Sequence, residues 1–132
     1  MKKIITVIVL LVAFALIFSC ATTYKPKGPV SCNCEIKWEV TKQADVTAFS
    51  CAIAKWKKRN AVLFKFKIKN ISDKPERFRI RITTAEGKSV GMLVPRKGKP
   101  PIIKPGEQKA GKLFMAQPFL PKKITVKVMI LD

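Results

Sequence analysis

The stretch FKFKIK, residues 64–69, decides the fold class, because apolar and basic residues alternate at every position. In a β-strand, successive side chains point to opposite faces of the sheet. The pattern therefore buries Phe64, Phe66 and Ile68 on one face and exposes Lys65, Lys67 and Lys69 on the other. A helix, with its period of about 3.6 residues, would not separate the two kinds of side chain in this way.

The same alternation recurs twice farther along the chain, over residues 77–82 and 123–130. Weaker strand patterns cover residues 34–40, 46–56, 89–94 and 110–116. Turn-forming residues lie between the strands at 70–75, 86–87 and 105–106. About seven short strands with turns between them and no convincing amphipathic helix predict an all-β fold, an antiparallel β-sandwich.

From residue 62 to 131 the chain also resembles small immunoglobulin-like bacterial modules. The matching pieces are Asn70-Ile71-Ser72, Glu86-Gly87-Lys88 and Pro105-Gly106-Glu107. The named pattern that they resemble is that of FxLyD-type domains, whose signature is absent here, with Ile82-Thr83-Thr84 near its place. The resemblance implies an Ig-like sandwich and transfers no functional residue.

The N-terminus has the pattern of an export signal. A basic start, Met1-Lys2-Lys3, precedes an apolar run at 4–18, and Ile17-Phe18-Ser19-Cys20 resembles a bacterial lipoprotein signal. The resemblance implies that Cys20 carries fatty acyl chains and that cleavage occurs before it. Ala21 favours the outer membrane by analogy, facing the periplasm or the surface if the cell is Gram-negative. An uncleaved anchor helix and a plain secretory signal are the alternatives.

These patterns divide the chain into three parts. Residues 1–19 form the signal peptide, residues 20–31 the lipidated cysteine and a flexible tether, and residues 32–132 the sandwich. A proline-containing linker advances about 3.1 Å per residue, so this tether would hold the domain up to roughly 34 Å from the bilayer.

Charge is the most informative functional feature, with 27 basic against 8 acidic residues and a formal net charge of +19. Such a balance attracts anions. For an exported protein the candidates are anionic lipid, lipopolysaccharide and cell-wall polymer, and we do not expect nucleic acid. Three basic groups are candidate anion-binding residues: Arg77, Arg79 and Arg81; Lys65, Lys67 and Lys69; and the loop residues Arg96, Lys97 and Lys99. Of these, the arginine row is the better candidate for phosphate or carboxylate, because arginine binds both groups bidentately.

The first two groups would repel each other if their strands paired directly. The two strands therefore belong to different sheets, or a bound anion relieves the repulsion. A solvated exterior with lysine-coated edges that block aggregation is the alternative to an anion site.

Three cysteines follow the lipidation candidate, and export permits a disulfide. We expect Cys51 to pair with Cys34 or Cys32, which leaves one thiol over. A lone C-x-C and three methionines also leave open a thiol or Cu(I) function. We expect no metal and no cofactor, because the chain has no histidine and no second cysteine pair.

No catalytic constellation is present in the sequence, since the serines have no histidine base and the acids are scattered. The sequence thus predicts a lipid-anchored, non-enzymatic envelope protein that binds an anionic component or a protein partner. A structural or assembly accessory of an envelope complex is the alternative function.

Overall fold

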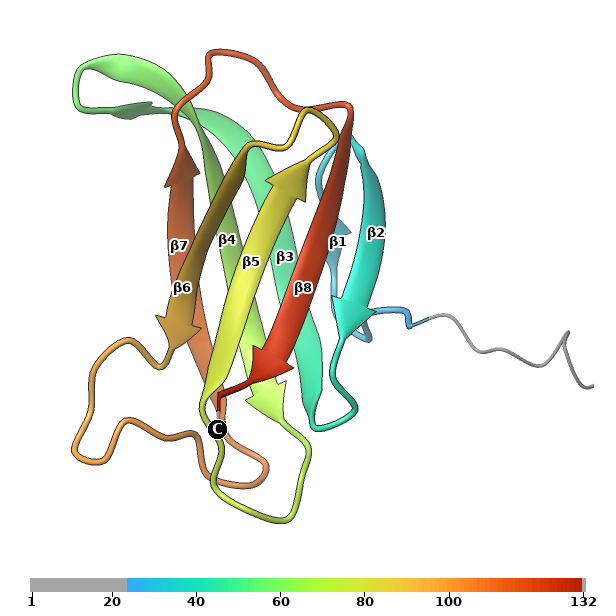
Figure 1. Ribbon diagram of the computed structural model, residues 1–132, viewed down its shortest axis with the longest axis vertical. Helices are drawn as coiled ribbons and strands as arrows, with labels where there is room; N and C mark the ends of the chain where they lie inside the picture. The colour runs from blue at the N-terminus through green and yellow to red at the C-terminus, as the bar shows by residue number, and fades with distance from the viewer. Residues whose placement is uncertain (1–23, 132) are drawn as a thin grey trace, which may run out of the picture.

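The computed structural model describes residues 24–131, which form two four-stranded sheets packed face to face (Figure 1). One sheet faces the viewer in Figure 1 and the other lies behind it. The strands are β1 (Val30–Ser31), β2 (Glu35–Val40), β3 (Ala44–Trp56), β4 (Arg59–Asn70), β5 (Phe78–Thr84), β6 (Ser89–Val94), β7 (Gln108–Met115) and β8 (Lys123–Ile130).

Sheet A, the rear sheet in Figure 1, has the strand order β1-β3-β4-β7. Sheet B, the front sheet, has the order β2-β8-β5-β6. The all-β sandwich is therefore confirmed, and the seven expected strands are joined by the two-residue β1. The expectation of purely antiparallel sheets is wrong at two edges, where β1 runs parallel to β3 and β2 parallel to β8. No hairpin joins either pair, so nothing imposes the antiparallel direction there.

Alternation in the sequence fixes which side chains form the core. Phe64, Phe66 and Ile68 on β4 are at most 2 % exposed. Their counterparts on β5 and β8 are equally buried: Phe78, Ile80, Ile82, Ile124, Val126 and Val128. These side chains point between the sheets and form one hydrophobic core within residues 24–131. We therefore expect residues 21–132 to fold without the preceding segment.

Strands β4 and β5 lie in different sheets. The lysine row consists of Lys65, Lys67 and Lys69 on β4, and the arginine row consists of Arg79 and Arg81 on β5 with Arg77 just before it. The two rows consequently occupy opposite outer faces of the sandwich. This confirms the first of the two expected ways in which the chain avoids a cluster of six like charges.

The segment from Tyr24 to Ser31 is docked on the sandwich, so the boundary expected at Ser31 is too late. The Tyr24 hydroxyl donates to Asp45 Oδ1 at 2.6 Å and accepts from the Val46 amide at 2.8 Å. The Pro29 carbonyl accepts from the Phe49 amide, and Gly28 lies directly against the Thr47 backbone, where a Cβ would not fit. Specific polar contacts hold this segment, and the sequence pattern did not indicate them.

Burial, together with the hydrogen bond to Asp45, holds the pKa of Tyr24 well above its usual value of about 10. The hydroxyl of the folded protein therefore stays protonated as the pH rises through 10. Its contribution to stability is fully present below the unfolded pKa of about 10 and is lost progressively as the pH rises from there to the higher folded-state pKa.

We expect Tyr24→Phe to lower the free energy of unfolding by about 1–3 kcal/mol, because Asp45 is only 4 % exposed and loses its hydrogen-bond donor. Urea denaturation of residues 21–132 measures the change. Tyr24→Phe should also speed proteolysis between Lys25 and Ser31. Unchanged stability and protease resistance would show that the segment is not held by this contact.

No helix within residues 24–131 is long and apolar enough to cross a membrane. The apolar run at 4–18 and Cys20, on which the signal and lipidation predictions depend, lie outside the described residues.

Candidate anion-binding face

The outer face of sheet A brings together lysines from two strands that are far apart in the sequence. Strand pairing places Lys65 of β4 between Ser50 of β3 and Lys112 of β7. The next outward row places Lys67 between Ala48 and Ala110. Lys65, Lys67 and Lys112 are exposed, and we call them the lysine triad.

Among residues 24–131, no acidic side chain forms an ion pair with the lysine triad. Within residues 24–131 the ion pairs are Lys37–Glu39, at 3.5 Å, and Lys109–Glu107, at 3.1 Å. Like charges directly opposite one another destabilise a sheet, and Lys65 and Lys112 are direct neighbours across β4 and β7. A bound anion would relieve this repulsion.

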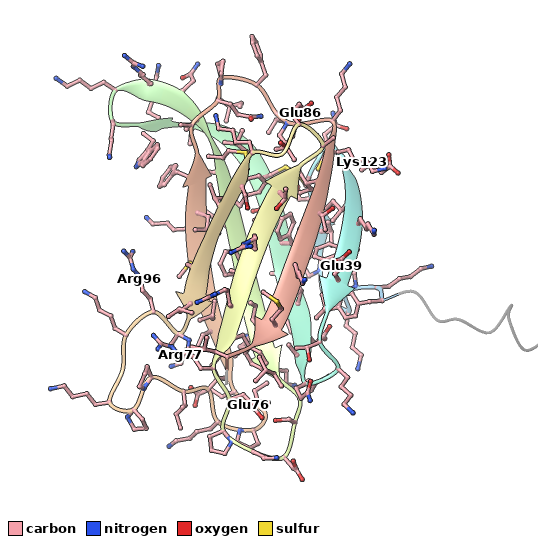
Figure 2. The ribbon with its side chains drawn as sticks, viewed as in Figure 1. Glu39, Glu76, Arg77, Glu86, Arg96 and Lys123 are labelled. Atoms are coloured by element: carbon pink, nitrogen blue, oxygen red, sulfur yellow. A yellow bond between two sulfur atoms is a disulfide. The ribbon has the colours of Figure 1, made fainter. Side chains whose placement is uncertain are left out.

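The outer face of sheet B carries its charges differently. Register places Glu35 beside Lys123 and Glu39 beside Lys127 across β2 and β8. Figure 2 shows Glu39 and Lys123 on these two strands, at the side of the sandwich away from β6. Acids and bases therefore lie side by side at the β2 edge of this face, whereas Arg81 is a direct neighbour of Lys127 farther in.

The lysine triad lines part of a shallow apolar groove of about 520 Å³ that extends to the β1 edge. Ala48, Ser50 and Ala110 share its outward face, and Pro29 and Ser31 line the groove at the β1 edge. Because these side chains are small, the stems of Lys65, Lys67 and Lys112 also contribute to the lining. Most of the surface lining the groove is hydrocarbon, although three of its lining residues carry a charge.

Beyond the groove, the same face becomes apolar. The adjacent row contains Ala52, Leu63 and Phe114. Trp56 stacks on Phe114 with ring centroids 5.4 Å apart and an interplanar angle of 4°. Lys57 Nζ lies 4.8 Å from the Trp56 ring centroid, within the range of a cation–π contact. The face therefore combines aromatic, aliphatic and cationic groups.

The arginine row, predicted as a single anion site, is divided in its roles. Arg77 is half-buried and donates to the carbonyls of Pro95 and Arg96 at 3.2 and 3.3 Å. Arg79 and Arg81 are exposed on the outer face of sheet B, where Lys127 lies beside Arg81. Arg77 thus holds the β6–β7 loop in place.

The loop residues Arg96, Lys97 and Lys99 are exposed between β6 and β7. Figure 2 shows Arg96 and Arg77 at the same corner of the sandwich. These residues form a separate basic corner.

The last of the predicted residues, Lys69, is half-buried at the end of the lysine row, opposite Asp45 and Gln108.

The cysteines form one cluster near the start of β2. Cys32 bonds to Cys51, the second of the two pairings expected, and Cys34 keeps a free thiol. Cys34 Sγ lies 3.0 Å from Cys32 Sγ, and burial raises the pKa of the Cys34 thiol. The three sulfur atoms lie within 4.8 Å of one another, but only one is a thiol while the disulfide is intact. A soft metal would need the reduced form.

No family model, curated protein or solved structure shows significant similarity to this chain.

Sequence reasoning found Lys65 and Lys67 but missed Lys112 and the groove. Lys112 belongs to a weakly patterned strand, and its place beside Lys65 depends on a register between segments about 47 residues apart. The small residues of the groove, Ala48, Ser50 and Ala110, carry no signal in the sequence, because only strand pairing brings them onto one face.

Proposed function

We propose that this protein is a lipid-anchored, non-enzymatic component of the cell envelope that binds an anionic envelope component through the lysine triad. The observation that carries the proposal is the uncompensated charge of Lys65, Lys67 and Lys112 around an apolar groove. Cationic side chains of this kind bind phosphate and carboxylate as point charges. The face of Arg79 and Arg81 carries Glu35 and Glu39 at its β2 edge, and it is the weaker candidate.

The docked N-terminal segment supports the same proposal. Tyr24 follows Cys20 by four residues, and an extended chain spans at most about 3.3–3.6 Å per residue. A lipid on Cys20 would therefore keep Tyr24 within roughly 14 Å of the bilayer, much closer than a tether ending at Ser31. Pro29 and Ser31 lead from Tyr24 to the edge of the groove. Anionic head groups would then lie within reach of the lysine triad.

The triple substitution Lys65→Ser, Lys67→Ser and Lys112→Ser should nearly abolish retention of residues 21–132 on anionic vesicles. Each lysine near an anionic surface contributes about 1 kcal/mol, so the loss should approach 100-fold. Sedimentation with phosphatidylglycerol-containing vesicles at low salt measures it. High salt should weaken the wild-type interaction in parallel, because these charges are exposed.

A matched control removes the same charge from the other face, through Lys37→Ser, Lys123→Ser and Lys127→Ser. This variant should keep most of its retention, and neither protein should bind vesicles of phosphatidylcholine alone. An equal loss in the two triple variants would mean that net charge alone drives binding. Undiminished retention of the lysine-triad variant would place the anion site elsewhere.

A further inference from the structure

The groove on sheet A suggests what kind of anion the lysine triad takes. Its volume of about 520 Å³ falls in the range of small-molecule sites, which is about 300–1,000 Å³. It extends from β1 across β3 and β4 to β7, and neighbouring strands lie about 4.8 Å apart. The groove is therefore roughly 14 Å long across the sheet.

Small side chains create the space. Ala48, Ser50 and Ala110 occupy outward positions where larger side chains would fill it. On the opposite side of β7, Gly111 leaves room for Phe66, because a Cβ there would lie 2.6 Å from atoms of its ring. Phe66 thus packs directly beneath the strand that forms the far end of the groove.

Polar groups are scarce inside the groove, and its charges stand at the rim. Burial of apolar ligand surface would therefore supply binding energy within it. Lysine stems can line an apolar chain while their ammonium groups stay in water, where they meet a charged group. A small inorganic anion would leave the apolar lining unused, and a neutral hydrocarbon would leave the lysines unused.

We propose that the groove binds an acyl chain of an anionic membrane lipid, with the lipid's phosphate held between Lys65 and Lys112. This inference rests on the proposed function and narrows the ligand from an anionic envelope component to an amphiphile. Charge complementarity at the rim, the hydrocarbon lining and the open β1 edge together select this occupant. The Leu63 and Phe114 row beyond the groove extends the apolar contact.

Calorimetric titration of residues 21–132 with three probes tests the inference: dodecyl phosphate below its micelle concentration, inorganic phosphate, and dodecyl maltoside. Dodecyl phosphate should bind at least about tenfold more tightly than inorganic phosphate, because each buried methylene adds to the affinity. It should also bind at least about tenfold more tightly than dodecyl maltoside, because only its head group is charged and meets the lysines. Ala110→Trp, which fills the groove, should remove the advantage of dodecyl phosphate over inorganic phosphate. Ser89→Trp, on the exposed edge strand of the other sheet, is the matched control and should change nothing.

The outcomes separate this inference from the proposed function. Equal affinity for the two phosphates, unchanged by Ala110→Trp, would overturn the acyl-chain site while leaving an anion site on the lysines. Equal affinity for dodecyl maltoside and dodecyl phosphate would overturn the anionic part of the inference. Failure to bind either phosphate or anionic vesicles would overturn both proposals. Ala48→Leu, a smaller change in the same groove, should reproduce the loss if Ala110→Trp impairs folding.

Discussion

Asn70→Asp should destabilise the domain by about 3–5 kcal/mol at neutral pH, because the side chain at this position donates two buried hydrogen bonds. Asn70 is fully buried, and its Nδ2 donates to the carbonyls of Lys74 and Ile103 at 2.7 and 2.8 Å. A carboxylate has no proton to give, so it would face two carbonyl oxygens while buried. Urea denaturation at neutral pH measures the loss.

Asn70→Asp should also make stability depend on pH in a defined direction. Burial and the facing carbonyls would raise the carboxyl pKa in the folded state above the unfolded value of about 3.9. The loss of unfolding free energy relative to wild type is therefore greatest above the raised folded-state pKa, and it shrinks as the pH falls towards 4. Asn60→Asp, at an exposed position of the same strand, should stay within about 0.5 kcal/mol of wild type at both pH values. Equal stabilities for the two variants would contradict the role given to Asn70.

Removal of the disulfide should be the second large effect. Cys51→Ala breaks the bond to Cys32, which links residues 19 apart, and should cost about 3 kcal/mol by releasing the unfolded chain. For a domain of this size that corresponds to a fall in melting temperature of roughly 10–20 °C. Thermal unfolding under non-reducing conditions measures it.

Cys34→Ala is the matched control, since it removes a half-buried cysteine without breaking the bond. It should lower stability by less than about 1 kcal/mol. Reductant should bring the wild type down to the level of Cys51→Ala and leave that variant unchanged. Equal melting temperatures for the two variants would refute the Cys32–Cys51 pairing.

Alternation alone predicted the strands and their inward faces, because burial of one side of a sheet leaves a period of two in the sequence. It could not predict β1 or the docking of Tyr24, which depend on a hydroxyl, one carbonyl and a glycine. It left the cysteine pairing open as well, since Cys32 and Cys34 differ by one strand period. Only the path of the chain decides between them.

The functional face shows the same division. Lys65 and Lys67 were evident from their alternation with buried residues, whereas Lys112 joined them through strand pairing. The 70–75 stretch was recognised as a turn. The buried network around Asn70 was not, because its partner Ile103 arrives from the long loop between β6 and β7.

Amide NMR spectra recorded during titration with glycerol phosphate test the central claim most directly, because they show which strands meet an anionic head group. The proposed site predicts saturable shifts at Lys65, Lys67 and Lys112, with little change at Arg79, Arg81 and Lys127. Shifts concentrated on the arginines of sheet B, or spread evenly over all exposed basic residues, would contradict an anion site on sheet A.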